Sequence, residues 1–406
     1  IEEQKSSFIR LFVLADWSKP YTTMAYEAEA IILKEFSKFF LNGSLYQGSK
    51  PVMWSPIEKT ALAEAEIEYH DIDSTSIYVA FKVKNSPNKL LENTSVIIWT
   101  TTPWTIPGNR AIAFGDSIDY CIFKVQESKN NLIKDNKYLV AKSLLEEVCD
   151  RCNISKFELI KEIKGEELRN TICYHPFSKI GFDYDVPLLK AEFVEDSEGT
   201  GFVHIAPCYG EDDYYLALDN NIIIKDIVKD DGCYRDNTPV FAGIHVFKAH
   251  LSVIENLEEQ NKLLGSREYR HSYPHSWRSK KPIIYRTTPQ WFISMKTNNL
   301  KDKAMQGIED TKWIPKSSKN RIQSMVENRP DWCVSRQRAW GVPLTIFINK
   351  NTGEPLKDEK VMERIIEDVK RKGSDVWLSE IPLKYLEKDY NPDDYYAVKD
   401  ILDVWF

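Results

Sequence analysis

Two segments of the chain concentrate small polar and ionisable side chains beside apolar runs. The first, Trp99–Asn109, reads Trp-Thr-Thr-Thr-Pro-Trp-Thr-Ile-Pro-Gly-Asn. Its four threonine hydroxyls donate and accept hydrogen bonds without fixed charge, so the segment can bind a ribose, an ester carbonyl or a water. Pro103 and Pro107 are expected to keep its backbone extended. The alternative is a threonine-rich strand edge without a ligand, because β-branched residues are common in strands.

The second segment, Gly199–Tyr214, contains His204 and the three consecutive acids Glu211, Asp212 and Asp213. A strand is expected to end at Pro207, and the acids lie where the next helix should begin. Helix N-termini stabilise carboxylates, so at least one acid should stay ionised and hold an ammonium group or orient a water. The alternatives are simple helix capping by the acids and a structural role for the histidine.

Hydrophobic periodicity predicts the elements that carry these segments. A three- to four-residue period predicts a helix over 22–42, with Thr22 or Thr23 as its cap, and further helices over 142–151 and 359–372. Alternation and short apolar runs predict strands at 77–83, 95–100, 111–114, 120–125, 157–160, 188–194 and 201–205, and a strand and hairpin near 342–352. The sequence therefore predicts a mixed α/β chain with a strand-rich, barrel-like domain over about 75–240.

The charge is distributed unevenly along the 406 residues. The chain has 54 Lys and Arg against 61 Asp and Glu, yet residues 266–340 carry 16 basic and 6 acidic residues. Aromatic residues interleave the basic ones, which is typical of a polynucleotide or nucleotide partner. A solvated charged face is the alternative.

Seven cysteines in a chain of this size indicate reduced thiols rather than disulfides. Cys149 and Cys152 are expected at a helix end rather than in a metal or redox site. The apolar runs are too short to span a membrane. The sequence contains no P-loop, Rossmann glycine fingerprint or metal-ligand cluster.

With these motifs in order, the chain resembles the isoleucyl-tRNA synthetases, class I enzymes, over essentially its whole length. Thr-Thr-Thr-Pro-Trp-Thr at Thr100–Thr105 resembles their editing-domain peptide. The valine and leucine enzymes carry Thr-Thr-Arg-Pro there, so Thr102 disfavours a valine-type enzyme. Gly199–Tyr214 resembles the second editing motif, and Trp332–Gly341 resembles the segment that re-enters the aminoacylation domain.

The resemblance implies a mixed α/β fold, in which a barrel-like editing domain is inserted in pieces of a Rossmann-type catalytic domain. We expect the chain to be the middle of a longer bacterial-type enzyme, because the two ATP-binding signatures of the family are absent from it. The implied parts are the end of the first catalytic half (1–50), a connecting subdomain (51–75), the editing domain (76–245), a basic connecting segment (246–325) and the start of the second catalytic half (326–406).

The resemblance also implies residue roles in hydrolysing valyl-tRNA(Ile) by a positioned water, and it leaves open whether valyl-adenylate is hydrolysed as well. The implied catalytic residues are Asp213, Thr100, Thr101 and Thr102. The implied substrate-binding residues are Trp99, Thr105, Asn109 and His204, and the implied tRNA-binding residues are Arg267, Arg270, Arg278, Lys280 and Lys281. A non-catalytic module that binds the tRNA 3′ end is the rival interpretation.

The implied partners are the acceptor end of tRNA(Ile) and a mischarged valine, for a cytoplasmic, monomeric protein without a membrane. ATP and Mg²⁺ are expected only for the full enzyme, and no cofactor is expected in this segment. Relatives often hold zinc through Cys-x-x-Cys knuckles, but residues 54–59 and 274–280 carry serines in their place. Serine hydroxyls do not replace thiolates as zinc ligands, so we expect no zinc.

Overall fold

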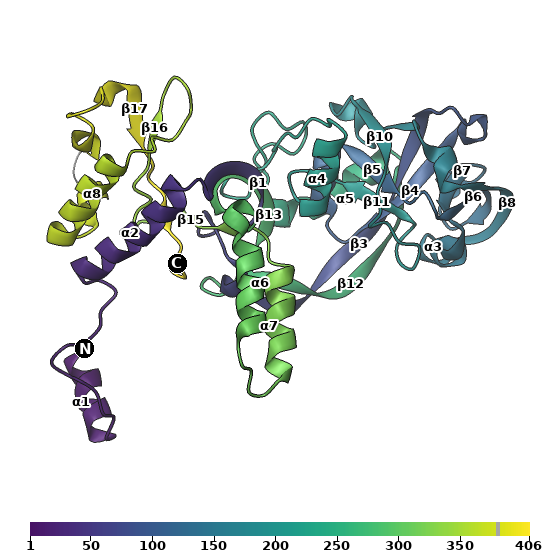
Figure 1. Ribbon diagram of the computed structural model, residues 1–406. Coiled ribbons are helices and arrows are strands. Elements are labelled where there is room, and N and C mark those ends of the chain that lie inside the picture. The colour runs from purple at the N-terminus through teal and green to yellow at the C-terminus, as the bar shows by residue number, and fades with distance from the viewer. Residues whose placement is uncertain (379–381) are drawn as a thin grey trace. The chain divides into compact units, whose positions relative to one another are not determined.

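The computed structural model describes residues 1–378 and 382–406 and divides into two compact units. Unit 1 contains residues 1–48 and 290–406, and unit 2 contains residues 49–289 (Figure 1). Each unit is described by itself. The finer division into five functional segments stays a prediction.

A mixed sheet of ten strands forms the centre of unit 2. Its order is β11 (Phe202–Ile205), β5 (Ala111–Phe114), β10 (Asp185–Lys190), β9 (Ile172–Tyr174), β3 (Ile67–Asn85), β4 (Thr94–Thr100), β7 (Lys137–Ala141), β6 (Asp119–Ser128) and β8 (Ile154–Lys164), with β12 (Leu263–Ser276) paired to β3. The pairs β5–β10 and β4–β7 are parallel, and the others are antiparallel. The prediction of a strand-rich, mixed α/β fold is confirmed, with β11 and β8 at the ends of the pairing path.

The central strands are buried on both faces. Residues Ser76–Phe81 of β3 and Val96–Ile98 of β4 are all buried, so their side chains fill the unit on either side of the sheet. This explains why β4 reads as a continuous apolar run instead of alternating. Strand β12 was not predicted, because its middle part carries charged, aromatic and polar residues instead of apolar ones. One face of it is half-buried and the other is exposed.

Three α-helices complete unit 2: α3 (Leu145–Arg151), α4 (Glu211–Asp219) and α5 (Val246–Glu259). The acids Glu211, Asp212 and Asp213 form the first turn of α4, as expected from the sequence. Gly210 is its N-cap and has no side chain to cap the helix, and acids in a first turn favour the helix dipole. Strand β1 (Leu45–Ser55) pairs with β2 (Thr60–Ala61) through Trp54 and Ala61.

In unit 1, the apolar faces of α2 (Tyr26–Leu41) and α8 (Glu359–Lys372) share one core. Helix α8 has the predicted bounds, whereas α2 begins at residue 26 and its N-cap is Ala25. Thr22 and Thr23 therefore do not cap α2, because the chain turns before the helix starts. The other helices of the unit are α1 (Glu2–Arg10), α6 (Leu300–Asp310), α7 (Ser317–Glu327) and α9 (Asp375–Leu378).

The strands of unit 1 are short. They are β14 (Trp332–Cys333), β15 (Ser335–Arg336), β16 (Phe347–Asn349), β17 (Tyr395–Ala397) and β18 (Ile401–Leu402), with the end of β13 (Ile284–Ile293) paired to β14. The strand predicted near 342–352 is β16, and a local antiparallel turn follows it, with a bridge between Ile348 and Pro355. The partner strand of β16 is the distant β17, which was not predicted. In the part of the chain that the structure describes, no helix is long and apolar enough to cross a membrane.

Burial in the sheet predicts a large effect of one truncation. Ile98 on β4 is fully buried, and Ile160 on β8 is 39% exposed. We expect Ile98→Ala to lower the free energy of unfolding by about 2–5 kcal/mol, because a cavity adds to the lost burial. Urea unfolding monitored by circular dichroism measures it, with Ile160→Ala as the matched control. Equal effects of the two substitutions would contradict the assignment of β4 to the core.

Candidate functional site

The threonine-rich segment forms the end of β4 and then a buried 3₁₀ turn, Pro103–Gly108. All six residues of this turn are buried. The prediction of an extended backbone is wrong here, because the fixed φ of proline suits the first turn of a helix as well as an extended chain. Pro103 begins the turn, and Pro107 lies inside it.

Side chains from distant segments satisfy the carbonyl groups of this buried turn. The hydroxyl of Tyr234 donates to the carbonyl of Trp104, His175 Nε2 lies 3.0 Å from the carbonyl of Ile106, and the Tyr184 hydroxyl donates to the carbonyl of Asn109 at 2.9 Å. A buried carbonyl without a partner would cost free energy, so these contacts hold the turn in one conformation. Sequence analysis missed all three donors, since nothing in the local pattern distinguishes them.

The turn is joined to β11 through the imidazole of His204. Nε2 of His204 lies 3.0 Å from the Thr105 hydroxyl, and Nδ1 lies 2.7 Å from Asn109 Nδ2. The Thr105 hydroxyl donates its own hydrogen to the carbonyl of Thr102 at 2.8 Å. The hydroxyl must therefore accept from Nε2–H, and Nδ1 accepts from the Asn109 amide.

Burial keeps this imidazole neutral. It lowers the pKa of His204 to about 3, and it lowers the pKa of His175 to about 3 as well. Below the ordinary pKa of 6.5, the unfolded chain binds protons at both positions while the folded chain does not. Both residues thus contribute stability above pH 6.5 that is lost as the pH falls towards 3. Neither histidine is suited to act as a general base or a cation at neutral pH.

Asp213 is anchored to the same strand end. Its Oδ2 accepts a hydrogen bond from the N–H of Ala206 at 2.7 Å, directly after β11. Burial raises the pKa of Asp213 to about 6, and the bond from Ala206 opposes the shift. The carboxylate is therefore ionised at pH 7, as predicted for one of the three acids, but it protonates in mildly acidic solution. Glu211 and Asp212 are exposed beside it.

Trp99 and the remaining threonines lie at the less buried side of the same region. Thr100, Thr101 and Thr102 are half-buried, and the Thr100 hydroxyl accepts from the N–H of Thr102 at 3.1 Å. A Cβ atom on Gly199 would lie 3.3 Å from the Trp99 ring, so the two predicted segments also meet here. The structure thus brings together Thr102, Thr105, Asn109 and His204, with Asp213 tied to the strand that carries His204. Trp99 lies instead against Gly199 and the ring of Tyr269.

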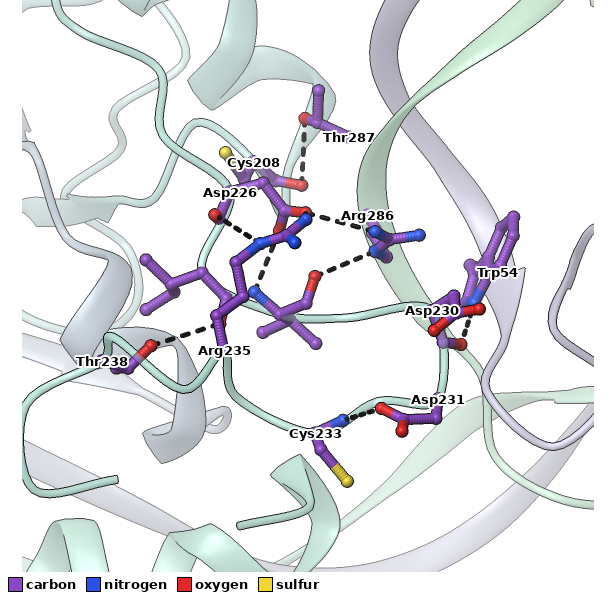
Figure 2. A network of polar contacts seen from close by, with 12 residues as sticks. Trp54, Cys208, Asp226, Asp230, Asp231, Cys233, Arg235, Thr238, Arg286 and Thr287 are labelled. Carbon is purple, nitrogen blue, oxygen red and sulfur yellow. Dashed lines mark hydrogen bonds and ion pairs between the residues drawn. The ribbon is translucent and has the colours of Figure 1, made fainter. Parts of the chain in front are cut away.

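A polar network holds residues 226–238, and its contact between Cys208 and Thr287 reaches the loop between β11 and α4 (Figure 2). Asp226 pairs with Arg235 at 2.8 Å and with the buried Arg286 at 3.3 Å. The carbonyl of Cys208 accepts hydrogen bonds from the backbone and hydroxyl of Thr287, at 2.9 and 3.2 Å. Tyr209 donates to Asp226 at 3.4 Å, so the residues that lead to Asp213 are held at both Cys208 and Tyr209. Sequence analysis did not identify Asp226 or Arg286.

The five cations predicted to bind tRNA lie on β12 and the turn that follows it. Three of them contact acids of their own unit: Arg267 with Asp150 (3.2 Å), Arg270 with Asp71 (3.8 Å) and Lys280 with Glu68 (2.6 Å). The guanidinium of Arg278 lies 5.6 Å from the centre of the Trp277 ring, and Lys281 is exposed. Three of the five predicted cations therefore lie beside a carboxylate of their own unit, in exposed pairs.

The two stretches examined for zinc in the sequence, residues 54–59 and 274–280, meet in the structure through hydrogen bonds between oxygen and nitrogen atoms. Glu58 accepts from the Ser276 hydroxyl at 2.9 Å and from the N–H of Ser279 at 3.0 Å. Within the described residues, no group of three or more His, Cys, Asp or Glu side chains is placed to hold a metal ion. One carboxylate and two serines do not fit the donor set of a tetrahedral zinc site.

The seven cysteines of the chain are free thiols. Burial raises the pKa of Cys149 to about 12 and also raises that of Cys152, so neither thiol forms a reactive thiolate at neutral pH. Both lie at the end of α3, as the sequence analysis expected.

The family model described as "tRNA synthetases class I (I, L, M and V)" matches residues 1–406, and the chain belongs to this family. Among its curated relatives are isoleucine–tRNA ligases. That of Pelagibacter ubique is 51% identical over 406 residues, covering 100% of this chain and 45% of the relative. That of Gluconobacter oxydans is 46% identical over 422 residues, with 100% and 44% coverage. The chain thus spans about half the length of these relatives.

Two solved structures show a remote likeness. The crystal structure of GlLeuRS-CP1 matches with a TM-score of 0.38 and 16% identity, covering 48% of this chain and 100% of that one. The editing domain of the Plasmodium falciparum cytosolic leucyl-tRNA synthetase matches with a TM-score of 0.37 and 12% identity, covering 48% and 99%.

The hydrogen bonds of His204 predict its protonation state. We expect its ring to remain neutral, with the proton on Nε2, from pH 8 down to pH 5, because burial excludes the charged form. Two-dimensional ¹H–¹⁵N spectra of the imidazole nitrogens test this, with His204→Gln identifying the signals. A ring that becomes doubly protonated above pH 5, or that carries its proton on Nδ1, would contradict the described network.

Proposed function

We propose that this chain is the editing part of an isoleucine–tRNA ligase and hydrolyses valine from mischarged valyl-tRNA(Ile), and from valyl-adenylate by the same chemistry. The family match and the isoleucine–tRNA ligase relatives support the enzyme class. The observation that carries the proposal is the hydrogen-bonded unit of Thr102, Thr105, Asn109 and His204, with the carboxylate of Asp213 tied to the same strand end.

Editing answers a limit on binding selectivity. Isoleucine and valine differ by one methylene, which a hydrophobic pocket distinguishes by only about 1–3 kcal/mol; this family is the standard example of that limit. A second site that admits valine and excludes isoleucine sterically removes the remaining errors. We assign the steric limit to Trp99 and His204, because a ring hydrogen-bonded on both nitrogens cannot turn aside for a larger side chain.

Each residue then has a definite task in hydrolysis. Asp213 pairs with the ammonium group of the amino acid through a charge-assisted hydrogen bond. Thr100, Thr101 and Thr102 bind the terminal adenosine and the ester and position the attacking water. No nucleophilic side chain is required, because an activated ester needs a positioned water and stabilisation of the developing oxyanion. This fits a neutral His204, which positions the turn through Thr105 and does not take a proton.

The wider setting is part of the same proposal. The acceptor end of tRNA(Ile) is the partner, and the exposed cations Arg278 and Lys281 near the ion-paired Arg267, Arg270 and Lys280 are available to its phosphates. The free thiols of the cysteines fit a reducing compartment such as the cytoplasm. ATP and Mg²⁺ belong to the aminoacylation reaction of the longer enzyme.

Replacement of Asp213 tests the assignment directly. We expect Asp213→Asn to lower kcat/KM for valyl-tRNA(Ile) hydrolysis by about 10- to 150-fold, from the loss of about 1.5–3 kcal/mol of a hydrogen bond to a charged group. Asp212→Asn, which changes the exposed neighbouring acid, is the matched control. Hydrolysis that is equally fast in both variants would refute the role of Asp213.

The same assay run across pH adds an independent check. Because the free carboxyl group has a pKa of about 6, kcat/KM of the unmodified chain should fall as the pH drops through that value. The Asp213→Asn variant should lack this acidic limb. If the folded chain binds tRNA but hydrolyses no valyl-tRNA at any pH, it is a binding module for the 3′ end and not an autonomous hydrolase.

We also propose that the loops at Glu58 and Ser276 are stable without zinc. Elemental analysis of the purified chain after dialysis should find substoichiometric zinc, and EDTA should leave the melting temperature unchanged. Glu58→Ala should instead lower that temperature, because it removes the acceptor of two hydrogen bonds. One zinc per chain, or a melting temperature lowered by EDTA, would contradict this.

A further inference from the structure

The connection between α6 and α7 and the start of α7 form a segment of unit 1 that is rich in positive charge. Between residues 312 and 321 the chain has four cations, Lys312, Lys316, Lys319 and Arg321, and no acid. The two helices pack against each other as a hairpin, with this turn at one end (Figure 1). Helix α7 has no fully buried residue, so its charges are presented on a surface.

Three of these cations differ from Arg267 and Arg270 on β12 in that they form no ion pair among the described residues. Lys319 pairs with Glu309 at 2.6 Å, and Asp310 accepts from Gln306 at 3.0 Å. Among the residues that the structure describes, Lys312, Lys316 and Arg321 are exposed and form no ion pair. Binding to a polyanion gains free energy by releasing the counterions of its phosphates, and a cation already neutralised by a carboxylate contributes less.

The positions of the cations on α7 make them unfavourable for the helix itself. Lys316 is the N-cap of α7, no side chain caps this end, and the first turn contains no acid. Cations at a helix N-terminus oppose the helix dipole, which favours acids there by about 0.3–1 kcal/mol each. The stability of α7 therefore does not explain Lys316 at this end, whereas the recognition of an anionic partner does.

We propose that Lys312, Lys316 and Arg321 form a binding surface for the phosphate backbone of RNA. This rests on the proposed function, in which the substrate is a charged tRNA. The chemistry of the turn favours a polyphosphate over a membrane surface, which would require several exposed apolar side chains. Trp313 is half-buried and donates its indole N–H to the carbonyl of Ile308. Ile314 is left as the exposed large apolar residue of the turn.

The test measures the affinity of the 406-residue chain for uncharged tRNA(Ile) at several salt concentrations. We expect the variant Lys312→Ala/Lys316→Ala/Arg321→Ala to reduce the slope of log K against log salt by about 2–3, at about 0.7–0.9 per lost phosphate contact, and to weaken binding at low salt by at least about tenfold. The control Lys357→Ala/Lys360→Ala/Lys370→Ala removes three exposed lysines of unit 1 at or near α8 and should leave the slope unchanged.

The outcomes separate the surface from the activity. Equal slopes for the variant and the control, with both folded by thermal melting, would overturn the surface even if valyl-tRNA is hydrolysed. A reduced slope without any hydrolysis by the unmodified chain would sustain the surface and refute the proposed function. Loss of binding to anionic phospholipid vesicles, with an unchanged slope for tRNA, would identify a membrane as the partner and overturn the proposal.

Discussion

The two hydrogen bonds of His204 are the constraint on which the candidate site depends. They join a turn after β4 to the strand β11, which are about 100 residues apart in the chain. Because the Thr105 hydroxyl donates a hydrogen bond to the carbonyl of Thr102, the position of the imidazole also determines where this carbonyl lies. Asp213 is bound to the residue after the same strand. A shift of β11 would therefore move the carboxylate and the threonine turn together.

Burial gives the two ionisable groups of the site different electrostatic roles. His204 is enclosed by uncharged partners, so burial removes its charge and leaves a rigid hydrogen-bonding ring. Burial also disfavours the charged form of Asp213 and raises its pKa, but the N–H of Ala206 and the first turn of α4 offset part of this shift. It remains an anion at neutral pH. The site thus has one negative charge, uncharged donors and acceptors, and no group poised as a nucleophile.

The scaffold holds this arrangement through side chains that never enter the proposed chemistry. Tyr234 and His175 bind carbonyl groups of the buried turn, and Tyr184 binds the carbonyl of Asn109 directly after it. Asp226, paired with Arg286, accepts from Tyr209 in the loop before α4. The cations differ in the same way: Arg267, Arg270 and Lys280 pair with acids of unit 2, whereas Lys312, Lys316 and Arg321 form no ion pair among the described residues. A cation that already pairs with an acid of the fold contributes less to the binding of an anionic partner, even where its segment is rich in Lys and Arg.

The sequence by itself determined the local features. The period of the apolar residues predicted α8 to the residue and most strands of the central sheet, since burial of one face or both leaves a readable pattern. The hydroxyl and carboxyl chemistry of both segments was equally visible. The tertiary structure alone decided that Pro103–Gly108 is a buried turn, that β12 pairs with β3 and β16 with β17, and that Arg267 and Lys280 are ion-paired. These features depend on contacts between residues far apart in the chain, and no local pattern encodes which distant group satisfies a buried carbonyl or a charge.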